Sequence, residues 1–152
     1  MSVKRILRYL QGTKDNGMVF NPPKKLVVDC YTGAGFAGLW GHKNIQDPIY
    51  AMSRTGFVVN FSYFPLLWVS KLQTDIYFST LHSEYVALYH SIRSLIPLKI
   101  FTKEVTDNLG IDSEKIKFVS SSNVYEDNNG AIVVATSTRM TPTSNNIDVK
   151  YN

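Results

Sequence analysis

Three strand-like runs come before any long helical stretch in this chain, and this order restricts the fold more than any other feature. Residues 26–31, 55–61 and 66–72 are rich in β-branched and aromatic side chains. A short connection containing Pro65 joins the last two runs. Strands joined by short connections usually pair side by side and antiparallel. We therefore expect the chain to begin its sheet with three antiparallel strands.

The second half of the chain has a helical pattern. Residues 80–94 form a predicted helix, which Pro97 is expected to break, and residues 98–109 form a second helix. A fourth strand is expected at 115–125 and a short helix at 131–135. The apolar stripe of the first helix consists of Leu81, Tyr85, Leu88, Ile92 and Leu95. The order of strands and helices predicts a mixed α/β fold with a largely central sheet.

The composition is that of a single globular domain. The chain has 152 residues, of which 44% are hydrophobic and 18% are charged. Its one cysteine, Cys30, excludes an internal disulfide and a cysteine-based zinc site. No apolar stretch approaches the roughly 20 residues of a membrane span, and the N-terminus lacks the apolar core of a secretory signal. We expect an intracellular protein, cytoplasmic or nuclear, without a membrane partner.

The positive charge is concentrated at the N-terminus. Residues 1–25 contain six basic residues and one acidic residue, so the other 127 residues of this +4 chain sum to −1. Lys4, Arg5 and Arg8 alternate with apolar residues at helical spacing. Such a helix could contact a phosphate backbone. It could equally be an ordinary helix with a solvated polar face.

Two carboxylates stand out by position. Glu84 lies within the apolar stripe of its helix, where a lone carboxylate is costly unless it is paired, protonated or bound to metal. The alternative is that it sits at the edge of the stripe and reaches water. Asp127 follows a strand and precedes a helix, a common ligand-binding position, but Asp is also a favoured helix N-cap. With Asp148 from the polar C-terminal segment, these carboxylates could converge on Mg²⁺.

Seven segments, in the same order, resemble the ribonuclease H region of copia-type LTR-retrotransposon polyproteins. The first resembles the connection from reverse transcriptase, and the others resemble successive ribonuclease H motifs. The segments are VKRILRYLQGTK (3–14), FAGLWGH (36–42), SRTGFV (53–58), WVSKLQT (68–74), STLHSEYVAL (79–88), EDNNGA (126–131) and IDVKY (147–151). The resemblance covers almost the whole chain.

This resemblance implies a ribonuclease H-like fold, with a mixed sheet of about five strands flanked by helices and a truncated last helix. It divides the chain into a connection segment at 1–23 and a ribonuclease H-like domain at 24–152. It also implies hydrolysis of the RNA strand of RNA–DNA hybrids by two metal ions, Mg²⁺ or Mn²⁺. The implied metal ligands and catalytic residues are Glu84, Asp127 and Asp148. The residues implied to contact nucleic acid are Lys4, Arg5, Arg8, Asn128 and Asn129.

The chain departs from the family pattern on the opening strand. The family has aspartates where this sequence has Gly33 and Gly35. Glycine supplies no oxygen ligand, so the resemblance implies an impaired nuclease. Asp29 lies on the same strand but about 13 Å from Gly33 at about 3.3 Å per residue, too far to replace the missing ligand. Two alternatives are a non-catalytic nucleic-acid-binding module and a protein-interaction module. The expected protein partners are the reverse transcriptase portion of a larger polyprotein and a second copy of the chain.

Overall fold

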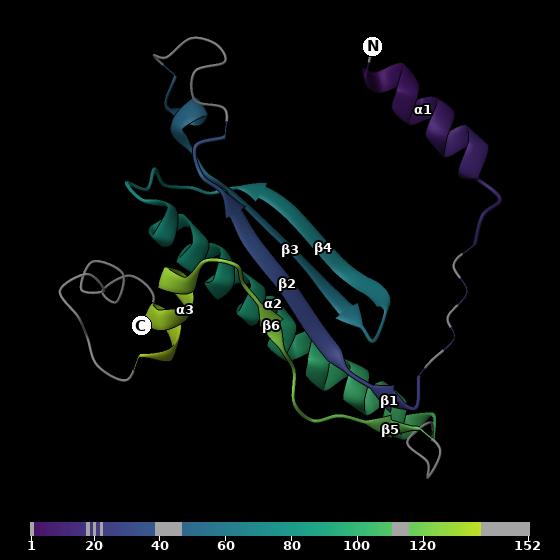
Figure 1. The fold of residues 1–152 in the computed structure, drawn as a ribbon. Helices are drawn as coiled ribbons and strands as arrows, with labels where there is room; N and C mark the ends of the chain where they lie inside the picture. Colours follow the sequence, from purple (N-terminus) through teal and green to yellow (C-terminus); the bar gives the residue numbers. More distant parts are fainter. Residues whose placement is uncertain are drawn as a thin grey trace.

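Figure 1 shows the computed structural model of the chain, which describes residues 2–17, 19, 21, 23–38, 47–110 and 116–137. The elements in chain order are α1 (Ser2–Thr13), β1 (Lys25–Leu26), β2 (Val28–Gly35), a 3-10 turn (Pro48–Ala51), β3 (Arg54–Phe61), β4 (Phe64–Leu72), α2 (Thr80–Asn108), β5 (Lys117–Phe118), β6 (Val124–Tyr125) and α3 (Asn129–Thr136). The expected mixed α/β architecture is confirmed.

Four strands form the main sheet, in the order β4-β3-β2-β6. β2 pairs antiparallel with β3, and β3 pairs antiparallel with β4, as the strand-like runs predict. β6 lies parallel to β2, with Tyr125 opposite Tyr31. The parallel pairing brings the end of β6 to the half of β2 that holds Gly33, which positions the candidate site.

The expected first and fourth strands are each divided in two. β1 leaves the main sheet and pairs in parallel with β5 as a separate two-stranded sheet. The division of the first strand falls at Val27, whose N–H donates to the Ser62 hydroxyl at 3.3 Å and whose carbonyl accepts from the Ser62 N–H. The single strand expected at 115–125 becomes β5 and β6, because β5 pairs with β1 whereas β6 pairs with β2.

Pro97 does not break the long helix, so the expectation of two separate helices is wrong. α2 continues from Thr80 to Asn108 with Pro97 inside it. Proline has no N–H to donate to the carbonyl of Arg93, and this costs about 3 kcal/mol in a helix interior. Leu95 and Leu98, on either side of Pro97, both pack against the core of the sheet. We infer that this burial keeps the chain helical through the proline.

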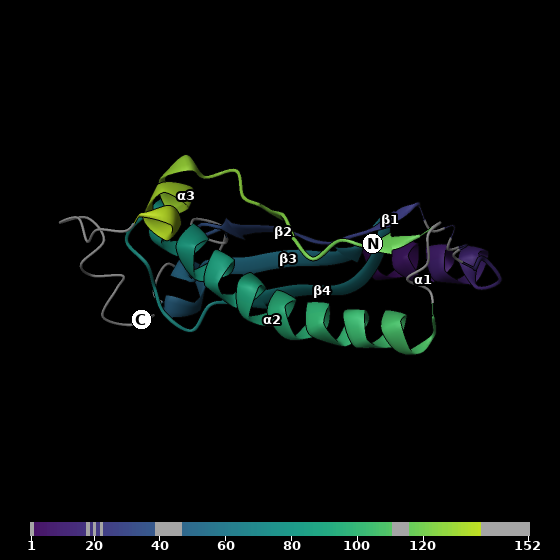
Figure 2. The same cartoon turned by 90° about the horizontal axis from the view of Figure 1, so that it is seen from below.

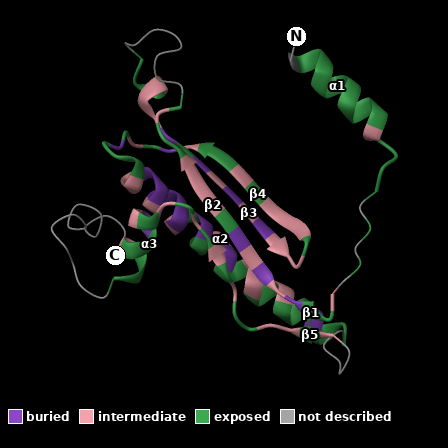
Figure 3. Cartoon of the chain, in the orientation of Figure 1, coloured by how far each residue is buried: buried purple, intermediate pink, exposed green. Residues whose placement is uncertain are grey.

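The core lies between α2 and one face of the sheet (Figure 2). Its buried members are Val28, Cys30, Phe57, Val59 and Leu95. The buried residues accordingly follow the central strands and the sheet-facing side of α2 (Figure 3). Tyr31, Trp68 and Tyr125 on the opposite face of the sheet remain 45–69% exposed. The arrangement is one helix layer on one sheet layer within the described part of the chain.

α1 has the amphipathic pattern that the sequence predicts, but its apolar side chains are exposed. Val3 is 70% exposed and Leu10 is 55% exposed. Among the described residues, no helix is long and apolar enough to cross a membrane. The division of the chain at residue 23 stays a prediction.

Candidate functional site

Glu84 is buried although it carries a carboxylate. It lies in the second turn of α2, which begins after Ser79, where the Ser79 hydroxyl accepts from the His82 N–H at 3.2 Å. Only 6% of Glu84 is exposed, and its Oε2 accepts a hydrogen bond from the backbone N–H of Ala34 on β2. Of the two interpretations that the sequence left open, the structure therefore has the buried and partnered carboxylate.

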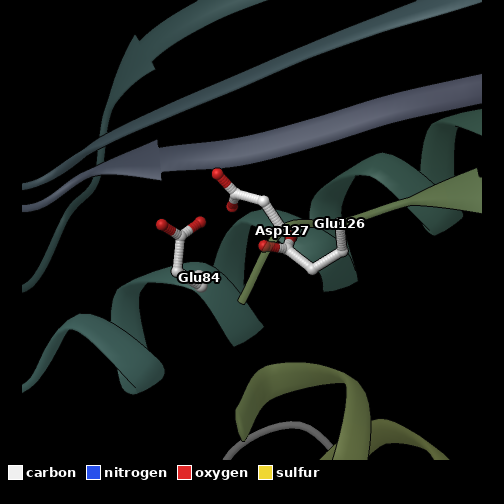
Figure 4. Close-up of side chains that lie close together, drawn as sticks. All are labelled: Glu84, Glu126 and Asp127. Carbon is white, nitrogen blue, oxygen red and sulfur yellow. The ribbon is translucent and has the colours of Figure 1, made fainter. Parts of the chain in front are cut away.

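Asp127 lies between β6 and α3, as the sequence predicts. The N-cap of α3 is Asn128, whose side chain accepts from the Ala131 N–H at 3.0 Å, so Asp127 does not cap the helix. Glu84, Glu126 and Asp127 each have a carboxylate oxygen within 4.8 Å of those of the other two. Figure 4 shows these side chains converging from α2 and from the segment after β6. We call these three residues the carboxylate cluster.

Glu126 is a member of the cluster that the sequence analysis did not select. It appeared there only within a motif, because the neighbouring Asp127 accounted for the acidic position after the strand. One Glu126 oxygen accepts from the Asn128 N–H at 3.1 Å, and its other oxygen is buried without a described partner. The sequence feature that could have identified Glu126 is the pair of consecutive acidic residues directly after a strand.

The crowding of carboxylates changes their acidity. The pKa of Glu126 is raised to about 7, chiefly by burial and also by the nearby Glu84 and Asp127, against the lowering effect of the Asn128 N–H. The pKa of Glu84 is also raised, chiefly by burial, with a smaller contribution from Asp127. Neighbouring carboxyl groups whose pKa values are raised by burial and by each other's charge are typical of functional sites.

Gly33 lies beside the cluster. A Cβ atom placed on Gly33 would lie 3.8 Å from Glu84 Oε2, an ordinary contact, with no other neighbour outside the adjoining residues within 4 Å. A side chain at this position therefore has room and would start next to the carboxylates. Asp29 is engaged elsewhere, because its Oδ1 accepts from the Asn123 N–H at 2.8 Å.

The other candidate residues either are not members of the carboxylate cluster or fall outside the described residues. Asp148 falls outside the described residues, as does the segment expected to lead into a last helix. Asn129 is the exposed first residue of α3, next to the N-cap Asn128. The basic residues Lys4, Arg5 and Arg8 are exposed on α1. The structure thus brings together two of the three predicted acidic residues and adds Glu126.

The donor set of the cluster fits a divalent cation such as Mg²⁺. Mg²⁺ prefers oxygen ligands and is usually held by only a few carboxylates while it keeps several waters. Glu84, Glu126 and Asp127 offer carboxylate oxygens only, close enough to share one ion. A bound cation would also relieve the repulsion between carboxylates, which adds to the effect of burial in raising the pKa values of the two glutamates.

Among the relatives found by comparison with known proteins, three are of the same kind. The chain is 31% identical over 150 residues to the retrovirus-related Pol polyprotein from transposon TNT 1-94 of Nicotiana tabacum, a match that includes 99% of the chain. It is 32% identical over 84 residues, 55% of the chain, to the corresponding polyproteins from transposons RE2 and RE1 of Arabidopsis thaliana. The chain is homologous to a segment of these Pol polyproteins.

The Pol-related segment is short relative to its homologues. It spans about a tenth of the tobacco polyprotein and 5% of each Arabidopsis polyprotein. No protein-family profile matches the chain. No solved structure matches it either.

Proposed function

We propose that this chain is a ribonuclease H-like domain derived from a copia-type retrotransposon Pol polyprotein, and that its nuclease activity is weak. The observation that carries the proposal is the convergence of Glu84 and Asp127 beside Gly33. The sequence motifs imply metal ligands at these positions, on three separate elements. An unrelated fold would have no reason to gather them in one place.

The topology supports the same proposal. Three antiparallel strands are followed by a long helix and then by a strand parallel to the first. In such a sheet, the end of β2 and the end of β6 lie side by side, and a helix that packs on the sheet can bring its first turns to the same end. A site built from a strand, a helix and a strand end follows from this arrangement.

In the proposed function, Glu84, Glu126 and Asp127 hold the metal. Bound Mg²⁺ or Mn²⁺ would supply Lewis-acid stabilisation of the charge that develops on the phosphate during hydrolysis. The Ala34 N–H holds the Glu84 carboxylate in place. The Asn128 N–H does the same for Glu126. The substrate would be the RNA strand of an RNA–DNA hybrid.

Gly33 is the reason that we propose weak activity. A Cβ at this position would lie 3.8 Å from Glu84 Oε2, yet glycine has no side-chain oxygen to offer. A missing electrostatic ligand typically costs a factor of roughly 10² to 10³ in rate. Glu126 supplies a third carboxylate, but it comes from the same segment as Asp127 and not from the strand on the opposite side of the cluster.

A non-catalytic nucleic-acid-binding module is the second candidate function. The exposed basic residues Lys4, Arg5 and Arg8 on α1 favour it, because they can contact phosphates without any metal. In this alternative, the hybrid is recognised by its shape and 2′-hydroxyls but is not cut. The reverse transcriptase portion of the polyprotein is the proposed covalent neighbour in either case.

The test is metal-dependent cleavage of a labelled RNA–DNA hybrid by the full chain and by Gly33→Asp. We expect slow cleavage by the chain and cleavage faster by roughly 10² in Gly33→Asp, which should vanish when Asp127→Asn is added. Equal rates for the chain and Gly33→Asp would show that Gly33 is not the weak point. Hybrid binding without cleavage in both proteins would favour the non-catalytic module.

A further inference from the structure

A hollow lies away from the carboxylate cluster, between α2 and the β3–β4 side of the sheet. Its volume is about 400 Å³, within the range of small-molecule sites. On α2, it is lined by residues such as Val86 and His90. Glu84 and His90 are six residues apart, which places them about 120° from each other around the helix axis. The hollow and the cluster therefore face different directions.

Three basic side chains line this hollow: Lys71 from β4, and His90 and Arg93 from α2. The pKa of His90 is lowered by burial and then by the charges of Arg93 and Lys71, so all three groups are close enough to interact. Neither Lys71 nor Arg93 forms an ion pair with a described residue. None of the described lining residues is acidic. These three residues are exposed to solvent, and an anion would supply the counter-charge that the described lining residues do not.

The inner wall of the hollow is mainly apolar, with one polar group left unsatisfied. Phe57 and Tyr77 are buried and line it. The Gln73 amide donates to the Thr55 hydroxyl at 3.0 Å and to the Ser83 carbonyl at 2.9 Å. Because a carbonyl can only accept, the orientation of this amide is fixed. Gln73 Oε1 is then buried without a hydrogen-bond partner among the described residues. A ligand N–H would satisfy this acceptor.

We infer that this hollow binds a nucleotide unit, with its base against Phe57 and Tyr77 and its phosphate at Lys71 and Arg93. A flat base suits an aromatic and apolar wall, and a phosphate suits an arginine and a lysine. Because Gln73 Oε1 is fully buried, an exocyclic amino group on the base would donate to it only after neighbouring side chains move. The inference goes beyond the proposed function, since it needs neither metal nor the carboxylate cluster.

The test is isothermal titration of the full chain with AMP, adenosine and inorganic phosphate, in EDTA. Working without metal keeps the result independent of any failure of the carboxylate cluster. We expect saturable AMP binding that is at least about tenfold tighter than that of either half of the ligand. Lys71→Gln combined with Arg93→Gln should weaken AMP binding by at least about tenfold. Lys99→Gln combined with Lys117→Gln removes the same amount of charge outside the hollow and should leave AMP binding unchanged.

The wall is tested separately by Gln73→Leu. The full chain should prefer AMP to purine riboside monophosphate, which lacks the amino group, and Gln73→Leu should remove that preference. A single-stranded oligo(dA) then identifies the source of the nucleotide. If oligo(dA) binds more tightly than AMP and displaces it, the hollow binds one nucleotide unit of a strand. If AMP binds and oligo(dA) does not displace it, the hollow binds a free nucleotide. The inference is overturned if AMP does not saturate at millimolar concentration, or if both double variants weaken it equally.

Discussion

Glu84 on α2 accepts a hydrogen bond from the backbone N–H of Ala34 on β2, one residue after Gly33. This bond fixes the helix carboxylate against the strand, so that a Cβ at Gly33 would lie 3.8 Å from Glu84 Oε2. Position 33, where the family resemblance predicts a carboxylate, therefore lies beside the carboxylate cluster.

Metal affinity should respond to a carboxylate at position 33 and much less to one at position 35. A side chain at Gly33 starts beside Glu84, whereas nothing lies within 4 Å of a Cβ at Gly35. We expect Gly33→Asp to tighten Mn²⁺ binding by at least about tenfold and Gly35→Asp to change it less than threefold. Titration followed by Mn²⁺ electron paramagnetic resonance measures both. An equal gain in both variants would show that added charge, not position, is responsible.

Glu84→Gln and Glu84→Ala should separate the structural and charge contributions of this residue. Glutamine can still accept from the Ala34 N–H, so we expect the free energy of unfolding to stay the same or rise. Alanine leaves that N–H without its acceptor and should lower the free energy of unfolding by about 1–3 kcal/mol. Urea denaturation measures both values. If the two variants lower the free energy of unfolding equally, the hydrogen bond from the Ala34 N–H does not account for the contribution of Glu84 to stability.

The stability of the metal-free protein should fall as the pH rises from about 4.5 to about 7. The pKa of Glu126 is about 7 in the folded chain, against 4.5 as its ordinary value. The folded state therefore holds a proton that the unfolded state has lost, and this advantage is complete below pH 4.5 and disappears through pH 7. Glu126→Gln should reduce this part of the pH dependence.

The measurement is urea denaturation of both proteins between pH 4.5 and 8. Asp107→Asn is the control, because Asp107 is an exposed carboxylate far along α2 that pairs with Lys103 at the surface. A pH profile of Glu126→Gln that matches the unmodified chain would contradict the assignment of this titration to Glu126.

Pro97→Ala should stabilise the protein. The change restores an N–H that can donate to the Arg93 carbonyl within α2, and Pro97 itself is exposed. We expect the free energy of unfolding to rise by about 1–3 kcal/mol. Ile96→Ala, at an exposed position one residue earlier, should change it by less than about 0.5 kcal/mol. A destabilised Pro97→Ala protein would mean that the proline is required for the path of the helix.

Hybrid binding should depend on the basic residues of α1. Alanine at Lys4, Arg5 and Arg8 should weaken binding and reduce the log–log salt slope by about 0.9 for each lost phosphate contact. Fluorescence anisotropy across a series of salt concentrations gives the slope. Unchanged affinity and slope would identify α1 as a helix with an ordinary solvated face.

The sequence by itself determined the local elements and the residues worth examining. Runs of β-branched and aromatic residues predicted the three antiparallel strands. Helical periodicity predicted the first half of α2, because side-chain periodicity reflects which face of an element is buried. Glu84 stood out for the same reason, as a carboxylate on an apolar stripe. The glycine at position 33 was visible only through the family resemblance.

Tertiary structure decided the rest. Packing of Leu95 and Leu98 keeps α2 helical through Pro97, against the local preference of proline. Pairing with different partners divides the run at 115–125 into β5 and β6. Glu126 joins the cluster only because β6 lies parallel to β2 and ends beside Glu84. A sequence records the preferences of neighbouring residues, whereas burial and proximity arise from contacts between segments far apart along the chain.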